Sequence, residues 1–234
     1  MRSDNRKDNE MRELHILKDV QEQSDGSCLI SLGNTRVLCA VRFNSKVPLF
    51  LRGSGEGWIT AEYSMLPGST NTRTSRNNIN SGRTKEIQRL IGRSIRSAID
   101  LAQIGENTLM IDCDVINADG GTRTAAIIGS FIALNNAIRK LQSKKILSRN
   151  INIYPVAAIS VGLTENNIIL DLNYEEDSKA IADFNFVMDE NQNMIEVQGT
   201  GESGKFTQSQ LMTAVDMASI AIKEIINIQK KYLD

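Results

Sequence analysis

The chain has few of the side chains on which metal sites and hydrolytic triads depend. Its 234 residues include one histidine, His15, so a histidine cluster cannot hold a metal ion. A Ser/His/Asp triad would have to use His15, which lies in a segment patterned like a strand, and we expect it to be structural. The cysteines Cys28, Cys39 and Cys113 form no Cys-x-x-Cys pair, so we predict buried thiols in a reducing compartment and exclude zinc and disulfide scaffolds.

Long apolar runs and an excess of charge are also missing. No segment approaches the roughly 18–20 apolar residues that cross a bilayer. Residues 1–8 are mostly charged, where a secretory signal would be apolar. The net charge is −1 and 41% of the residues are hydrophobic, which excludes disorder over most of the chain. We therefore expect a folded cytoplasmic protein that makes no membrane contact.

Strand-like and helix-like patterns alternate along the sequence. Short runs rich in branched residues predict strands at residues 13–20, 27–32, 35–43, 59–65, 107–117, 151–163, 168–172, 182–188 and 194–197. Apolar residues three or four positions apart predict three long helices, which begin near Thr84, Gly121 and Thr207. The helix from Gly121 is apolar on most sides, so we expect it in the middle of the structure. No linker rich in proline or glycine divides the chain, and the pattern predicts an α+β fold in a single domain, residues 1–234.

Basic residues are concentrated in one stretch of an otherwise nearly neutral chain. Between residues 69 and 98 there is one acid, Glu86, against the basic residues Arg73, Arg76, Arg83, Lys85, Arg89, Arg93 and Arg96. Arginine makes paired hydrogen bonds to phosphate oxygens, whereas solubility alone would be served by lysine. The stretch favours binding of a polyanion, and such binding should weaken with salt. The plainer interpretation is a solvated helix face preceded by a loop.

Two glycine-containing segments precede predicted helices. Residues 119–124 read Asp-Gly-Gly-Thr-Arg-Thr, and residues 81–84 read Ser-Gly-Arg-Thr. Glycine lets the backbone approach an anion closely, and the first amides of a helix point partial positive charge at it. Each segment alone is also typical of a plain helix cap, and neither has the spacing of a Walker loop or a dinucleotide fingerprint. Their similarity favours convergence on one anion.

Acidic residues gather at the end of the predicted strand 168–172 and after it, at Asp171, Glu175, Glu176, Asp177 and Asp183. Carboxylates beside a phosphate site can hold Mg²⁺ or move a proton at a leaving oxygen, whereas the plainer interpretation is a polar turn. Asp171 lies between two leucines, where a lone charge needs a partner. Asp112 and Asp114 point to one sheet face, and we expect them to be structural and able to pair with arginines.

Four longer blocks contain these motifs. They are residues 57–67 (GWITAEYSMLP), 82–93 (GRTKEIQRLIGR), 112–115 (DCDV) followed by 118–125 (ADGGTRTA), and 170–177 (LDLNYEED). In this order they resemble the ribonuclease PH family, the phosphorolytic exoribonucleases of bacteria. The resemblance extends over essentially the whole chain.

The resemblance implies a fold, an assembly and a reaction. The fold would be the α+β domain of that family, related to the second domain of a small-subunit ribosomal protein, and the assembly would be a homohexameric ring, a trimer of dimers. Inorganic phosphate would attack the last phosphodiester at an RNA 3′ end and release a nucleoside diphosphate, in a reaction that also runs in reverse. The substrate would be the 3′ tail of precursor tRNA, with phosphate as co-substrate and Mg²⁺ as cofactor.

The resemblance also assigns roles to residues. The positions matching the family's phosphate site are Arg83, Gly121, Thr122 and Arg123. The acidic pair thought to carry catalysis matches Asp171 and Asp177. Either Asp177 would protonate the departing 3′ oxygen, or Asp171 and Asp177 would hold Mg²⁺, and the sequence leaves both possibilities open.

The chain departs from the family pattern in the segment associated with RNA binding and ring contacts. Gly68 stands where the family usually has arginine, and residues 77–80 form a shortened, uncharged version of a basic loop. Arg73 and Arg76 remain, and we expect them to bind RNA together with Arg93.

Two other functions are alternatives to phosphorolysis. A non-catalytic ring subunit of an exosome-like assembly would grip RNA for another enzyme, but such a subunit should lack the acidic pair or the glycine turn, and both are present. A metal-dependent hydrolase could use the same carboxylates, and a phosphate requirement separates it from a phosphorolytic enzyme.

Overall fold

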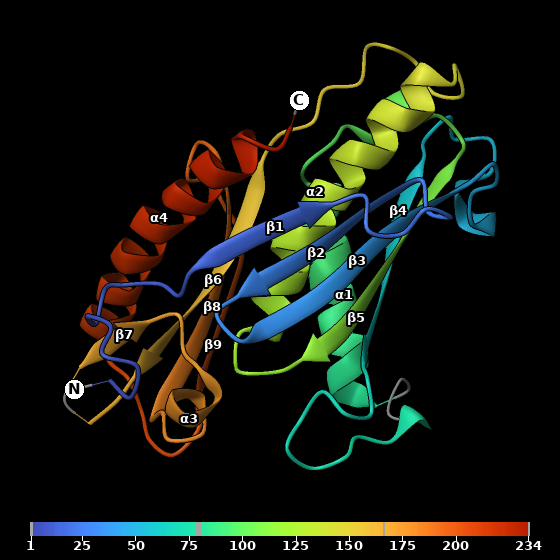
Figure 1. Ribbon diagram of the computed structural model, residues 1–234. Coiled ribbons are helices and arrows are strands. Elements are labelled where there is room, and N and C mark those ends of the chain that lie inside the picture. The colour runs from blue at the N-terminus through green and yellow to red at the C-terminus, as the bar shows by residue number, and fades with distance from the viewer. Residues whose placement is uncertain (1, 78–80, 166, 234) are drawn as a thin grey trace.

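The computed structural model describes residues 2–77, 81–165 and 167–233, and there two β-sheets lie on either side of a central helix (Figure 1). The strands are β1 (Leu14–Lys18), β2 (Gly26–Leu32), β3 (Thr35–Asn44), β4 (Trp58–Met65), β5 (Thr108–Asn117), β6 (Val156–Leu163), β7 (Ile168–Leu170), β8 (Ala182–Asp189) and β9 (Met194–Gly201). The α-helices are α1 (Gly82–Arg96), α2 (Thr122–Ser143), α3 (Tyr174–Asp177) and α4 (Gln208–Lys230). The α+β class predicted from the sequence is confirmed.

The two sheets differ in how their strands are connected. The first sheet has the order β1-β2-β3-β5-β4, in which β4 runs parallel to β5 and the other neighbours are antiparallel. Parallel neighbours need a crossover connection, and α1 lies in that connection and packs against β4. The second sheet is antiparallel throughout, in the order β7-β6-β8-β9.

Helix α2 is buried on most sides because its sequence is apolar on most sides, as predicted. It packs against β2 and β3 of the first sheet and against β6 of the second. Two glycines permit this close packing, since a Cβ atom at Gly26 would clash with the carbonyl oxygen of Ala133, and one at Gly129 would lie 2.8 Å from the sulfur of Cys39. Helix α4 covers the second sheet through β6, β7 and β8, so β6 is buried along its whole length.

Two predicted strands prove shorter, for reasons that lie in the backbone. The predicted strand 151–163 begins only after Pro155, which has no N–H to give to a ladder. The predicted strand 168–172 ends before Asp171, whose φ of 51° is left-handed and incompatible with a strand. The acids that follow form the one-turn helix α3, because the side chain of Asn173 caps its first amides in a capping box.

The predicted burial of the three cysteines is confirmed. Cys28, Cys39 and Cys113 are buried free thiols, and burial raises the pKa of Cys28 to about 12, so that it stays protonated and unreactive. His15 is exposed on β1, with its Nε2 atom 3.1 Å from a carboxylate oxygen of Glu13. A search of the described residues finds no helix with the length and apolar character needed to cross a membrane.

Candidate active site

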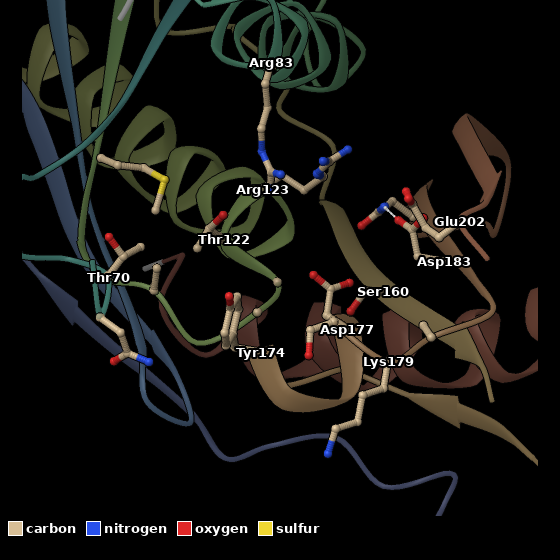
Figure 2. Close-up of a pocket in the computed structure, with 18 of the residues that line it drawn as sticks. Thr70, Arg83, Thr122, Arg123, Ser160, Tyr174, Asp177, Lys179, Asp183 and Glu202 are labelled. Atoms are coloured by element: carbon tan, nitrogen blue, oxygen red, sulfur yellow. Dashed lines mark hydrogen bonds between the residues drawn. The ribbon is translucent and has the colours of Figure 1, made fainter. Parts of the chain in front are cut away.

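A cavity of about 800 Å³, here called the main pocket, opens beside the starts of α1 and α2 (Figure 2). The residues that line it and bear on its chemistry are Thr70, Asn71, Thr72, Thr74, Arg83, Gly120, Gly121, Thr122, Arg123, Ser160, Tyr174, Asp177, Lys179, Asp183, Asn185 and Glu202. They come from the second sheet, from the loop at residues 70–74 and from three helices, so the pocket exists only once these parts have packed together. Figure 2 shows the arginines on one side of the pocket and the acids across from them.

The two arginines of the main pocket come from the first turns of two different helices. Arg83 follows Ser81, whose hydroxyl caps α1 by accepting the amide of Thr84 at 3.2 Å. Arg123 is fixed more firmly, because its Nη1 atom donates to Gln198 at 3.1 Å and lies 3.4 Å from a carboxylate oxygen of Glu86. The guanidinium group of Arg83 makes no such contact with any residue that the structure describes. The guanidinium of Arg123 is therefore preorganised for binding, whereas that of Arg83 can adjust its position.

The turn before α2 presents free backbone amides to the main pocket. Gly120 and Gly121 have φ values of 71° and 63°, and a Cβ atom at Gly120 would clash with the carbonyl oxygen of Leu172, so only glycine fits there. Among the described residues no side chain caps α2, which leaves its first amides available to an anion. The hydroxyl of Tyr63 donates to Thr122 Oγ1 at 2.8 Å, so the hydroxyl proton of Thr122 remains free for another acceptor.

Two acids face these cations from the second sheet and α3. Asp177 and Asp183 both line the main pocket. Burial raises the pKa of Asp177 above its ordinary value, while Arg83 and Arg123 act in the opposite direction. Burial also raises the pKa of Asp183, and the neighbouring charge of Asp177 adds to the effect. One of the two carboxyl groups therefore keeps its proton to a higher pH than an isolated aspartate would.

Asp171, which the resemblance pairs with Asp177, lies outside the main pocket. Its side chain is fully buried, and Oδ1 accepts Arg12 Nη2 at 2.7 Å. Its Oδ2 accepts Arg12 Nε at 2.9 Å and the Arg12 backbone amide at 2.7 Å. Both carboxylate oxygens are thus engaged by Arg12, and the acids beside Asp177 in the pocket are Asp183 and Glu202. Asp183 follows Asp177 by six positions, the same spacing as between Asp171 and Asp177, so spacing alone could not distinguish the two pairs.

The arginines expected to bind RNA lie at different distances from the site. Arg73 and Arg76 are exposed in the loop whose residues 70–74 form one rim of the main pocket. Arg93 is exposed on α1 and does not line the pocket, since it pairs with Glu196 at 2.6 Å. Of the shortened loop at residues 77–80, residues 78–80 lie outside the described part of the chain.

The sequence left arginine pairs possible for Asp112 and Asp114, but among the described residues neither forms an ion pair with an arginine. They share a face of the first sheet, where Asp112 is paired in register with Glu62 of β4. Burial raises the pKa of both aspartates, and the charge of Glu62 adds to the effect at Asp112. The described residues contain no group of three or more His, Cys, Asp or Glu side chains arranged to hold a metal ion.

One aromatic side chain in the main pocket was not singled out by the sequence. Tyr174 begins α3, its backbone amide donates to a carboxylate oxygen of Asp119 at 3.1 Å, and it is 57% exposed. An exposed aromatic ring in a polar pocket offers a surface on which a nucleic-acid base can stack.

Two family models match the chain. Residues 10–140 match domain 1 of the 3′ exoribonuclease family, and residues 154–221 match domain 2 of the same family. The chain is 51% identical over 233 residues to a protein named Ribonuclease PH from Crocosphaera subtropica, covering 99% of this chain and 97% of that protein. It is 48% identical over 236 residues to a protein of the same name from Corynebacterium kroppenstedtii, covering 100% of this chain and 93% of that protein.

Solved structures share the fold at low sequence identity. The rice (Oryza sativa) protein Rrp46 superposes with a TM-score of 0.80 at 19% identity, over the full length of both chains. A chain of the Archaeoglobus fulgidus exosome with RNA bound to its active site superposes with a TM-score of 0.83 at 19% identity, covering 97% of this chain and 91% of that one. With two family models over most of its length and relatives at about half identity over nearly all of it, the chain belongs to the 3′ exoribonuclease family that includes ribonuclease PH.

Proposed function

We propose that the main pocket carries out phosphorolysis at the 3′ end of RNA, with inorganic phosphate as the nucleophile. The observation that carries this proposal is the placement of two arginines and an uncapped helix start opposite two acids in one pocket. Phosphate is both the anion to be bound and the attacking group, so the protein has to position and partly neutralise it rather than supply a base. The absence of a histidine from the pocket is therefore no obstacle.

The phosphate site consists of Arg83, Gly121, Thr122 and Arg123. Each guanidinium can donate two parallel hydrogen bonds to phosphate oxygens, and the first amides of α2 add partial positive charge. The hydrogen bond from Tyr63 occupies a lone pair of Thr122 and turns its hydroxyl proton toward the bound anion. A phosphate oxygen held in this way can attack the terminal phosphorus in line with the departing 3′ oxygen.

Asp177 provides the proton that the departing 3′ oxygen needs. Its raised pKa suits this role, because a carboxyl group that keeps its proton to a higher pH is a better acid near neutrality. Asp183 stands next to it as a second carboxylate, and repulsion between the two charges favours protonation of one of them. Asp171 supports the site from outside, through Arg12.

The residues present also fit a magnesium ion. Mg²⁺ is held by one or two carboxylates together with water and substrate phosphates, and Asp177 and Asp183 supply those carboxylates, with Asn185 beside Asp183. Asp171 has no free oxygen to contribute. When bound, the ion would neutralise charge on the phosphates. A protonated carboxyl is a poor metal ligand, so the effect of Mg²⁺ on the pH profile separates the acid role of Asp177 from a ligand role.

The RNA strand approaches past the rim formed by residues 70–74, with Arg73 and Arg76 beside it and Arg93 farther along α1. The exposed ring of Tyr174 lies in the pocket, where the terminal base can stack on it. We further propose that the substrate is the 3′ tail of precursor tRNA, that the chain acts as one domain with a continuous core, and that it assembles as a homohexamer. A cytoplasmic location stays a prediction.

A trimming assay tests the proposed function. A tRNA with a short 3′ tail is incubated with and without inorganic phosphate, and the released nucleotides are separated. Shortening that requires phosphate and yields nucleoside diphosphates is expected, as is tail extension when nucleoside diphosphates are supplied. Release of monophosphates without phosphate would indicate a hydrolase, and binding without shortening would indicate a non-catalytic subunit.

A further inference from the structure

We propose that Arg12 and Thr35, neither of which lines the main pocket, are positioning residues that hold the turn at residues 119–121 in the conformation that binds phosphate. Arg12 precedes β1 and Thr35 begins β3, so both are about 80 to 110 positions from the turn in sequence. The proposal deepens the function proposed above, because it rests on that turn being part of the phosphate site.

Arg12 contacts the turn with the one edge of its guanidinium that its carboxylate partner leaves free. Asp171 accepts Nη2 at 2.7 Å and Nε at 2.9 Å, which fixes the plane of the group. Nη1 then donates to the carbonyl oxygen of Asp119, the residue that opens the turn. A Cβ atom at Gly121 would lie 2.9 Å from Nη2, so the arginine lies directly against the turn.

Thr35 holds the same turn through a single buried hydroxyl. Its Oγ1 accepts the backbone amide of Asp119 at 3.0 Å and donates to the carbonyl oxygen of Gly120 at 2.6 Å. Its side chain and backbone are fully buried at the start of β3. Arg12 and Thr35 together therefore engage the amide of residue 119 and the carbonyls of residues 119 and 120.

The turn needs such support because the backbone of its two glycines is conformationally flexible. Gly120 and Gly121 are both at positive φ, and glycine has more backbone conformations to lose than any other residue. Because Arg12 and Thr35 already fix the peptide groups of the turn, the first amides of α2 point into the pocket before phosphate binds. Binding then costs less conformational entropy. Lysine cannot replace Arg12 in this role, because a single ammonium cannot bind both carboxylate oxygens and the Asp119 carbonyl in a fixed plane.

This assignment also explains the buried Asp171. The backbone of Asp171 has a left-handed φ of 51°, and its side chain is fully buried. Its carboxylate balances the positive charge of Arg12 beneath the turn. Its effect on the reaction passes through Arg12, so it is a positioning residue as well.

Kinetic analysis of Arg12→Lys, with Arg2→Lys as matched control, tests the proposal. Arg2 lies on the same N-terminal segment and is 8% exposed against 6% for Arg12. It pairs with Glu176 through two hydrogen bonds of 2.7 and 2.8 Å and donates to the backbone carbonyl of Asp171 at 3.0 Å, but among the described residues no hydrogen bond or ion pair joins it to the turn. Arg12→Lys should raise the KM for phosphate about tenfold, the equivalent of one hydrogen bond, with kcat at saturating phosphate nearly unchanged. Arg2→Lys should leave the KM for phosphate unchanged even if it lowers Tm as much.

A second pair of variants, at Thr35, tests the same proposal if Arg12→Lys does not fold. Thr35→Val preserves the shape of the side chain and removes its hydroxyl, whereas Thr35→Ser keeps the hydroxyl. Thr35→Val should raise the KM for phosphate several-fold and Thr35→Ser should not. The rise in Tm that inorganic phosphate produces in the wild type should shrink in Arg12→Lys and Thr35→Val only. This measurement needs no turnover, so it still reports on the turn if the reaction proves not to be phosphorolysis. Equal phosphate KM values and equal Tm shifts in all four variants would overturn the proposal.

Discussion

The two arginines of the main pocket should contribute unequally to phosphate binding. The side chain of Arg123 is oriented by hydrogen bonding, whereas that of Arg83 is free to move. Arg123 is 19% exposed and already oriented by Gln198 and Glu86, at 3.1 and 3.4 Å. Arg83 is exposed, and among the described residues nothing fixes its guanidinium. Ordering a free arginine side chain costs up to about 2 kcal/mol of rotamer entropy, which offsets part of what its hydrogen bonds contribute.

The expected magnitudes follow from these contacts. A hydrogen bond to a charged group contributes about 1.5–3 kcal/mol, so Arg123→Ala should raise the KM for phosphate by roughly 10- to 150-fold. Arg83→Ala should raise it less, by about 3- to 10-fold, because part of the gain is lost in ordering the side chain. Arg123→Lys should fall between the wild type and Arg123→Ala, since lysine keeps the charge and loses the paired hydrogen bonds.

Initial rates of nucleoside diphosphate release, measured over a range of phosphate concentrations at saturating RNA, give these KM values directly. Arg139→Ala is the matched control, because Arg139 is an exposed arginine on α2, the helix that Arg123 begins, and it does not line the pocket. The control should leave the KM for phosphate unchanged. Equal effects of Arg83→Ala and Arg123→Ala, or effects on the KM for RNA alone, would refute the reasoning.

Substitutions at three further positions test the roles of Asp177, Tyr63 and Tyr174. Asp177→Asn should lower kcat about 10²- to 10⁴-fold. Because burial raises the pKa of Asp177, wild-type activity should fall as pH rises through that pKa, and a pH–rate profile should show this alkaline limb missing in Asp177→Asn. Tyr63→Phe removes the hydrogen bond to Thr122 and should raise the KM for phosphate about 2- to 10-fold in the same kinetic assay, while its KM for RNA stays constant. Tyr174→Leu should raise the KM for RNA about 5- to 150-fold through lost stacking, and Tyr174→Phe should restore it; an unchanged KM for RNA in Tyr174→Leu would remove Tyr174 from the binding path.

The sequence predicted the elements well where the signal was local. Helix α2 was placed in the middle from its apolar residues alone, and it contacts both sheets. Strand ends were less accurate, because they depend on single residues such as Pro155, which lacks an N–H, and Asp171, which turns left-handed. The order of the strands was not predicted, since pairings such as that of β4 with β5 are set by packing over long sequence separations.

The candidate site was also predicted only in part, because some of its residues have a local sequence signal and others are placed by long-range packing. The arginines and the glycine turn have local sequence signals, and Arg83 and Arg123 line one pocket. Which acids face that pocket depends on the left-handed backbone at Asp171 and on the short helix that follows it, and no spacing in the sequence encodes either. The contact of Arg12 with the Asp119 carbonyl spans 107 positions, so sequence patterns gave no sign of it.

If the main pocket binds phosphate as proposed, the anion lies next to carboxylates that repel it, and the fold accommodates this by placing the arginines and the acids on different layers. Arg83 and Arg123 stand at the starts of α1 and α2, whereas Asp177 and Asp183 come from α3 and β8. Because α2 packs on both sheets, the spacing between the charges is set by its contacts with the core. The packing of α2 therefore determines both the stability of the fold and the distance between Arg123 and Asp177. Substitutions that shift α2 without touching the pocket, such as Gly129→Ala against Cys39 and Ile30, should change turnover as well as Tm.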